Sequence, residues 1–444
     1  MTATPFDLAE ALNHGCVCQT LRPDLLHAQL ARDPKLHALS CALHQTHPHL
    51  FSSTVVFLSE KTYQGIQDTI AAVERLTHLP AWEQSALRGA TADMRIDHGP
   101  QGAFMGYDFH VRHGSAQLIE INTNAGGALL NAALARAQAA CCTAMNTSLT
   151  SYRNMATLED DFFAMFRSEW QAQRGDATWR TVAIVDDAPD GQYLAPEFEL
   201  ARNLFTAHGI DAHIADGRTL RFENGCLWAD ATAIDLVYNR LTDFDLSDPQ
   251  HAALAEAWRH GAVVLTPDPR IHALRANKAH LSTLSNADAL LALGASQQDI
   301  ATLQAHIPPC ERVTPATASR LWDMRRTLFF KPLNGFGSRA VYRGDKLTRR
   351  VWEDIVAGDY IAQNLVPPGE RVLSARADDA LLKFDVRAYA YAGQVQLLAA
   401  RMYQGQTTNF RTEGGGFAPV VVVKEDSVER YAAALQAQPT SAAA

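Results

Sequence analysis

The sequence has little of what marks several common classes of protein. Cysteine is sparse, with 7 in 444 residues, and no apolar run is long enough to cross a bilayer. The N-terminus shows no basic segment followed by an apolar core, so no signal peptide is predicted. An odd number of cysteines without such a signal indicates reduced thiols. We therefore expect a cytoplasmic protein that does not associate with membranes.

An excess of basic charge is absent as well. The chain carries 39 Lys and Arg against 48 Asp and Glu, which gives a formal net charge of −9. Proteins that wrap nucleic acid are basic, so nucleic acid is not an expected partner. With 47% hydrophobic and 20% charged residues, the composition is that of a folded globular enzyme. The length predicts two or three domains.

Several catalytic and nucleotide-binding motifs are missing. We find no convincing Ser/His/Asp or Cys/His combination for nucleophilic catalysis. No Gly-Lys-Ser/Thr follows the glycines after Lys331, which excludes a Walker A loop. No internal repeat is evident. The chemistry must therefore come from other polar residues, which gather in three places along predicted strands.

The first 175 residues are predicted to be mostly helical, with one hairpin. Apolar residues recur at helical spacing in some segments and alternate with polar residues in others. The predicted elements are helices at 25–43, 66–76 and 128–145, a β-rich run at 51–58, and strands at 104–110 and 116–122 joined by a turn at His113-Gly114.

From about residue 175, short apolar strands alternate with helices, which is the pattern of a parallel α/β layer. Two of the later strands alternate in polarity. The predicted elements are strands at 181–185, 212–214 and 234–238, helices at 197–208 and 276–293, and further strands at 328–332, 340–342, 360–366, 383–391 and 394–401.

The first polar group is Glu120, Asn122 and Asn124, which alternate along a strand and therefore project to one face. Carboxylate and amide oxygens suit a hard cation such as Mg²⁺. The glycines at 126 and 127 would let a ligand or a backbone approach closely. The alternative is an exposed face of an edge strand, but the apolar neighbours of Glu120 favour a functional site.

The second group follows a strand that ends at Lys331. Asn334, Gly335 and Gly337 come next, and a flexible glycine loop after a lysine can hold a polyphosphate through its backbone N–H groups. Many strand connections contain two glycines, so this signal is weak when taken alone.

The third group lies near the end of the chain. Asp385 and Arg387 share one strand face, and Arg401, Asn409 and Arg411 follow before the glycines at 414–416. Isolated arginines usually lie on solvated faces. Clustered beside a glycine-rich loop, they are better suited to bind carboxylate or phosphate.

Together and in this order, the three groups resemble the ATP-grasp superfamily. Glu120 and Asn122 precede Lys331, an order similar to that of the circularly permuted branch, which includes eukaryotic-type glutathione synthetase. Residues 277–281 resemble the first phosphate-binding lysine at a helix start, 360–363 the adenine-binding hinge, and 235–240 a substrate-domain strand ending in arginine. The likeness spans roughly residues 50–420.

The resemblance implies an α/β (α+β) ATP-grasp fold, circularly permuted, with an inserted parallel α/β substrate module. Four parts are expected. They are a helical region with the metal-binding hairpin at 1–175, the substrate module at 176–275, the nucleotide-binding region at 276–435, and a flexible tail at 436–444.

The resemblance also implies roles for individual residues. For ATP these are Lys278, Lys331, Asn334, Gly335, Gly337, Gln363, Asn364 and Glu370. For the metal they are Glu120 and Asn122, with Asp385 or Asn334 as the third ligand. For catalysis they are Arg387, Arg401 and Arg411, and for the substrate Asn124, Gly126, Arg240, Asn409 and Gly415.

The activity implied is that of an ATP- and Mg²⁺-dependent ligase that joins a small carboxylic acid to an amine through an acyl phosphate. The alternatives are a small-molecule kinase on the same fold and an inactive nucleotide-binding protein. The substrates would be amino acids or small peptide-like molecules, and the resemblance suggests a homodimer.

Overall fold

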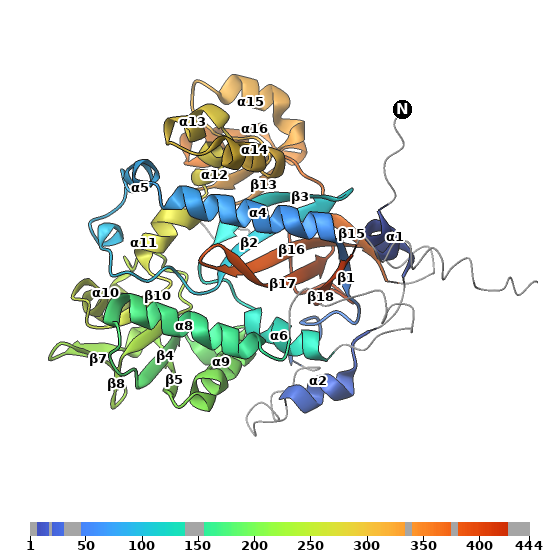
Figure 1. Ribbon diagram of the computed structural model, residues 1–444. Coiled ribbons are helices and arrows are strands. Elements are labelled where there is room, and N and C mark those ends of the chain that lie inside the picture. Colours follow the sequence, from blue (N-terminus) through green and yellow to red (C-terminus); the bar gives the residue numbers. More distant parts are fainter. Residues whose placement is uncertain are drawn as a thin grey trace, which may run out of the picture.

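The computed structural model describes residues 7–16, 20–30, 46–137, 155–333, 340–373 and 381–424. These residues form one large sheet, two small antiparallel sheets and one parallel sheet, with helices packed around them (Figure 1). No helix in this described part is long and apolar enough to span a membrane. Asn334, Gly335, Gly337 and the tail at 436–444 lie outside the described residues.

The large sheet joins early and late parts of the chain. Its strands run in the order β1-β18-β17-β16-β2-β3, with β15 paired to β16. The predicted hairpin is confirmed, and its turn residues His113 and Gly114 both have positive φ, as a tight hairpin turn requires. The strands are β1 (Val56–Ser59), β2 (Met105–Arg112), β3 (Ser115–Asn122), β15 (Gly369–Val372), β16 (Leu381–Tyr391), β17 (Gln394–Tyr403) and β18 (Gly416–Val423).

Both faces of this sheet are buried. On β17, Leu398 and Ala400 belong to one hydrophobic core, whereas Leu397 and Ala399 belong to another. The first core contains the apolar side of α4 (Glu60–Thr77), which begins where Ser59 accepts a hydrogen bond from the Thr62 N–H. The second contains residues of α6 (Ala128–Arg136) and α8 (Leu158–Arg174). The central strands are thus held rigidly from both sides.

A small antiparallel sheet lies beside the large one. Its core residues Phe330, Leu321 and Trp352 come from one strand and the two helices that cover it. The helix at 349 begins where the Thr348 hydroxyl accepts the Val351 N–H. The elements are β11 (Cys310–Arg312), β12 (Leu328–Pro332), β13 (Tyr342–Arg343) and β14 (Tyr360–Asn364), in the order β11-β14-β12-β13, with α15 (Ala318–Met324) and α16 (Arg349–Ala357).

The predicted parallel layer is present as a separate four-stranded sheet. Every pair in it is parallel, in the order β10-β9-β4-β5, and α8, α9 and α10 lie around it (Figure 1). Its elements are β4 (Thr181–Asp186), α9 (Ala195–Ala207), β5 (Asp211–Asp216), β9 (Leu236–Asn239), α10 (Ala252–Arg259) and β10 (Val264–Thr266). A small unpredicted antiparallel sheet of β6 (Arg221–Glu223), β7 (Cys226–Ala229) and β8 (Thr232–Ile234) is attached to it.

The prediction of one continuous helix at 276–293 is wrong, because the structure has separate short helices there. A π-helical turn (His272–Ala276) comes first, and Asn277 then accepts the Ala279 N–H before α12 (His280–Leu284) begins. Asn286 caps α13 (Ala287–Ala292) in the same way. The remaining helices are α1 (Leu8–Gly15), α2 (Pro23–Leu30), α5 (Pro80–Ala86), α11 (Pro269–Ile271) and α14 (Gln297–His306). Residues 31–43 and 138–145 of two predicted helices lie outside the described residues.

Two loops at one edge of the parallel sheet meet at a buried histidine. His251, whose side chain is 2% exposed, contacts Asp243 through Nδ1 at 2.8 Å and Asp187 through Nε2 at 2.9 Å. Arg218 lies 3.9 Å from the same Asp187 carboxylate. The hydrogen bond to Asp243, supported by the one to Asp187, outweighs burial and raises the pKa of His251 to about 9.

This raised pKa predicts that stability decreases at alkaline pH. The imidazolium contributes its full stabilisation below the unfolded-state pKa of about 6.5, and the contribution disappears as the pH rises through about 9. Urea unfolding across this range should give a falling free energy of unfolding in the wild type. The decrease should be smaller in His251→Gln. Parallel curves for the two proteins would contradict the assignment.

Candidate functional site

A cavity of about 560 Å³ lies between the large sheet and the small sheet. Strands β2, β3, β16 and β17 line one side, and β12 and β14 line the other. The predicted site residues that line it are Glu120, Asn122, Lys278, Lys331, Gln363, Asn364, Glu370, Asp385, Arg387 and Arg401. The fold thus brings into one cavity residues that are separated by more than half of the chain.

Lys331 connects the two walls of the cavity. Its side chain leaves β12, and its Nζ donates to Gln363 Oε1 of β14 at 2.8 Å and to the Ile119 carbonyl of β3 at 2.7 Å. The residue is 7% exposed. Burial lowers the pKa of Lys331, and nearby Glu120 opposes this shift. A buried ammonium that faces a cavity is suited to an anionic ligand.

A β-bulge explains why the Ile119 carbonyl is available to Lys331. Asp108 pairs with Glu120, but the next residue of β2, Phe109, pairs with Leu118, so Ile119 is the extra residue. A bulge turns one peptide group out of the regular ladder. Glu120 comes directly after the bulge, and its Oε1 lies 3.2 Å from Lys278 Nζ. The bulge therefore sets the positions of both a lysine partner and the predicted metal ligand.

Asp108 is the centre of a buried charge network and was not among the predicted site residues. Its carboxylate accepts hydrogen bonds from Arg387 Nε and Nη2, both at 2.7 Å, and from the Asn122 amide at 3.2 Å. Arg401 Nη2 lies 2.9 Å away. Burial raises the pKa of the Asp108 carboxyl, but the two arginines outweigh burial and hold it well below its usual range.

Asp385 of β16 extends this network to Thr408 in the loop after β17. Its Oδ1 accepts from Arg401 Nε at 2.7 Å, and its Oδ2 accepts from the hydroxyl of Thr408. Both carboxylate oxygens are thus engaged, and the residue is 1% exposed. Each oxygen keeps a second lone pair, so the role of Asp385 as a third metal ligand stays a prediction.

Arg240 and Gly126, whose predicted role in substrate binding stays a prediction, lie against each other in the interior. Arg240 is 8% exposed and donates from Nη1 to the Asn124 carbonyl at 2.9 Å. Buried Glu197 accepts the N–H groups of Gly127 at 2.7 Å and Leu129 at 3.1 Å. These contacts fix the loop between β3 and α6. The side chains of Arg240 and Glu197 thus support the loop that follows Glu120 and Asn122 in the chain.

The other predicted substrate residues also lie outside the cavity. The Asn124 amide donates to the Leu241 carbonyl at 2.8 Å. Asn409 caps its own loop, where it accepts the Arg411 N–H at 3.0 Å, and Arg411 is exposed. Gly415 donates its N–H to the Thr412 carbonyl. The structure therefore leaves Arg387 and Arg401 as the predicted catalytic arginines that reach the cavity.

Comparisons with known proteins identify the fold. No protein-family profile and no curated protein sequence matches this chain. A glutathione synthetase-like effector from Globodera pallida, solved in the apo form, superposes with a TM-score of 0.55. It has 12% sequence identity, and the match covers 92% of this chain and 99% of that chain.

Two further solved structures match less closely. A putative gamma-glutamylcysteine synthetase from Methylobacillus flagellatus KT gives a TM-score of 0.43 at 12% identity, covering 80% of this chain and 85% of that one. An ATP-grasp ligase complexed with a minimal precursor gives 0.32 at 15% identity, covering 59% and 82%. The predicted circular permutation stays a prediction. The overall similarity and the cavity between two facing sheets identify the architecture as an α+β ATP-grasp fold.

Proposed function

We propose that the protein is an ATP- and Mg²⁺-dependent ligase that joins a small carboxylic acid to an amine and forms ADP. The observation that carries the proposal is the convergence of Lys278, Lys331, Glu120 and Asn122 on one cavity between two sheets. Two ammonium groups beside a carboxylate and an amide suit a polyphosphate with its metal ion. The ATP-grasp architecture supports the same assignment.

The donor set fits Mg²⁺. Glu120 and Asn122 alternate on β3 and both line the cavity, and Mg²⁺ in proteins takes one or two carboxylates together with phosphate oxygens. Glu120 would hold the ion through its carboxylate and Asn122 through its amide oxygen. Bound there, Mg²⁺ would offset phosphate charge during transfer.

The chain's own residues would bind and orient the reactants, with ATP as a substrate. Lys278 and Lys331 would hold the phosphates while an oxygen of the acid attacks the γ-phosphorus. The bond from that phosphorus to the β–γ bridging oxygen breaks, and ADP leaves. The amine nitrogen then attacks the acyl carbon, the carbon–oxygen bond to phosphate breaks, and inorganic phosphate leaves with the amine proton.

Arg387, like Arg401, lines the cavity and is placed to stabilise the oxyanion of the second step. Asp108 takes its Nε and Nη2, and the described residues offer no hydrogen bond to its Nη1. The guanidinium is therefore oriented by a buried carboxylate while one N–H pair is available to a ligand. Preorganised donors of this kind are effective because they need no rearrangement during reaction.

Product analysis tests this function against the alternatives. The ligase should release ADP only when an acid and an amine are both supplied with Mg-ATP. ADP release with a single alcohol, yielding a stable phosphate ester, would identify a kinase instead. Mg-ATP should also raise the melting temperature, and Glu120→Ala should weaken this effect. The absence of any Mg-ATP effect on the wild type would contradict both enzyme assignments.

A further inference from the structure

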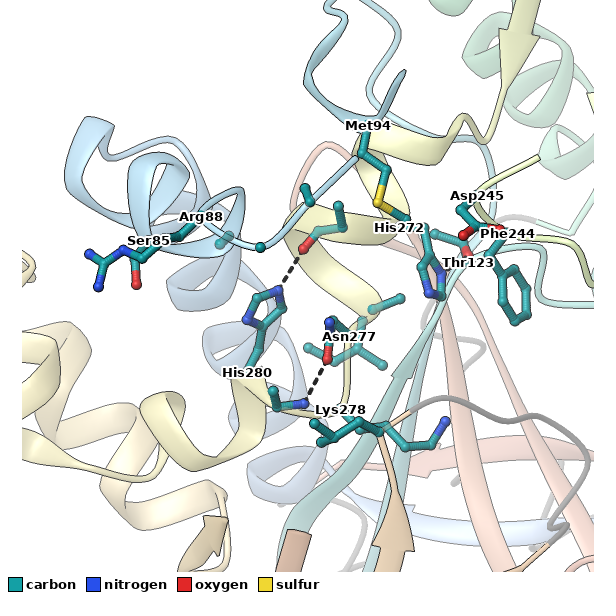
Figure 2. A pocket seen from close by; sticks show the side chains of 18 of the residues that line it. Ser85, Arg88, Met94, Thr123, Phe244, Asp245, His272, Asn277, Lys278 and His280 are labelled. Carbon is teal, nitrogen blue, oxygen red and sulfur yellow. Dashed lines mark hydrogen bonds between the residues drawn. The ribbon is translucent and has the colours of Figure 1, made fainter. Parts of the chain in front are cut away.

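A second cavity of about 960 Å³ adjoins the first at Asn122 and Lys278, which line both. Its walls come from α5 and the turn after it, from the end of β3, from the loop at 242–245, and from the segment at 272–283. Figure 2 shows residues of these segments around the space. A ligand group that reaches this shared wall would therefore lie next to the proposed phosphate-binding lysine.

The inner end of the second cavity favours an anion. Lys278 Nζ lies at this shared wall, where Glu120 on the side of the first cavity is its carboxylate contact at 3.2 Å. The amide of Asn122 is the other shared group. A carboxylate placed here would face an ammonium and would border the cavity proposed for the phosphates of ATP.

A different part of the cavity favours a cation. Asp243 and Asp245 line it. Asp243 is occupied by His251 and by the N–H groups of Ser247 and Asp248. Asp245 accepts from the Ser247 hydroxyl at 2.8 Å, which leaves most of its acceptor capacity for a ligand.

A flat, uncharged surface lies beside this acidic end. The rings of Phe244 and His272 stack with centroids 4.4 Å apart and planes 4° apart, and His272 Nδ1 bonds Thr123 Oγ1 at 3.0 Å. Burial, and then the neighbouring Lys278 and His280, lower the pKa of His272 to about 4. The ring is therefore neutral at pH 7 and does not compete with a cationic ligand group for the Asp245 carboxylate.

We propose that this second cavity binds the acid substrate of the ligase, and that the substrate is an amino-carboxylic acid longer than a single α-amino acid. The proposal rests on the proposed function. The reacting carboxylate lies at Lys278, the amino group lies at Asp245, and the chain between them crosses the Phe244–His272 surface. Asp245 and Lys278 come from two different walls of the cavity, the loop at 242–245 and the segment at 272–283 (Figure 2), and 960 Å³ is at the upper end for small-molecule sites.

The test uses hydroxylamine as the amine, because it traps acyl phosphates without knowledge of the natural acceptor. The acids are single amino acids, di- and tripeptides with free N-termini, and the N-acetylated forms of the same peptides. ADP release is measured for the wild type, Asp245→Asn and Ala90→Trp, in which the indole fills the cavity. Ala231→Trp, in the exposed β7–β8 turn, is the matched control. Melting temperatures are recorded with Mg-ATP alone and with the best acid alone.

We expect free-amino peptides to be the best acids and to stabilise the wild type without nucleotide. Asp245→Asn should raise their KM about tenfold, a free-energy change of about 1.4 kcal/mol, and should leave the N-acetylated forms nearly unchanged. Ala90→Trp should block acid binding, while both variants keep the melting shift caused by Mg-ATP. If Asp245 had only a structural role, Asp245→Asn would not alter the ratio between the KM values of free and N-acetylated peptides.

The outcomes separate the two proposals. No Mg-ATP shift in the wild type would overturn the proposed function itself. A normal Mg-ATP shift with unchanged KM values in Asp245→Asn and Ala90→Trp would overturn the second cavity as the acid site. A normal shift with no ADP release from any acid of the panel, or release from acetylated and free peptides alike, would overturn the substrate class.

Discussion

Replacing Lys331 with Met is expected to abolish the stabilisation by Mg-ATP and to lower ADP release at least about 100-fold, which is the typical cost of removing one preorganised electrostatic group. The ammonium lies at the meeting point of β12, β14 and the β3 bulge, where it contacts Gln363 and Ile119. Methionine keeps the length of the side chain and removes the charge. Differential scanning fluorimetry with and without Mg-ATP measures the effect.

The control for this variant is Lys346→Met. Lys346 is exposed and lies outside both cavities, although it belongs to the same small-sheet region. It should keep the full Mg-ATP shift. Because Lys331→Met also removes two protein contacts, its melting temperature without nucleotide should fall too. A lower melting temperature combined with an undiminished Mg-ATP shift would show that Lys331 is a structural group only.

Replacing Asp108 with Asn should destabilise the fold by about 3–5 kcal/mol, the cost of removing one partner from a buried ion pair. Asp108 is 2% exposed and faces both Arg387 and Arg401. Without its charge, two guanidinium groups would remain in the interior, and only Arg401 would keep a carboxylate partner among the ion pairs of the described residues, namely Asp385. Urea denaturation gives the free energy of unfolding for comparison with the wild type.

Asp359→Asn is the matched control for this prediction. The Asp359 side chain is 74% exposed and pairs with Arg312, which is 50% exposed. Exposed pairs contribute about 0–1 kcal/mol, so this variant should unfold almost as the wild type does. Equal free energies of unfolding for Asp108→Asn and Asp359→Asn would contradict the central role given to the buried network.

Much of the fold could be predicted because its elements are encoded locally. The hairpin has alternating residues and a turn that tolerates positive φ at His113 and Gly114. The strand ending at Lys331 is a short apolar run. In contrast, the broken helix at 276–293 depends on Asn277 and Asn286, whose side chains replace backbone hydrogen bonds. Helical periodicity alone does not reveal such interruptions.

The site was harder to predict where a residue's partner is distant in the sequence. Asp108 stands in a strand of apolar character, and its role depends on β16 lying beside β2 with Arg387 opposite it. For Arg240 the resemblance implied a role with the substrate, but the sequence could not reveal that buried Glu197 lies 3.8 Å from its guanidinium. A polar residue pattern indicates chemistry, whereas long-range packing decides what the residue contacts.

The most direct measurement of the central claim is a crystal structure of the protein with Mg²⁺ and a non-hydrolysable ATP analogue. The account predicts the nucleotide between β12–β14 and the β2–β3–β16 face, with its phosphates at Lys278 and Lys331 and the metal at Glu120 and Asn122. A nucleotide bound elsewhere, or a cavity that stays empty at saturating analogue, would contradict it.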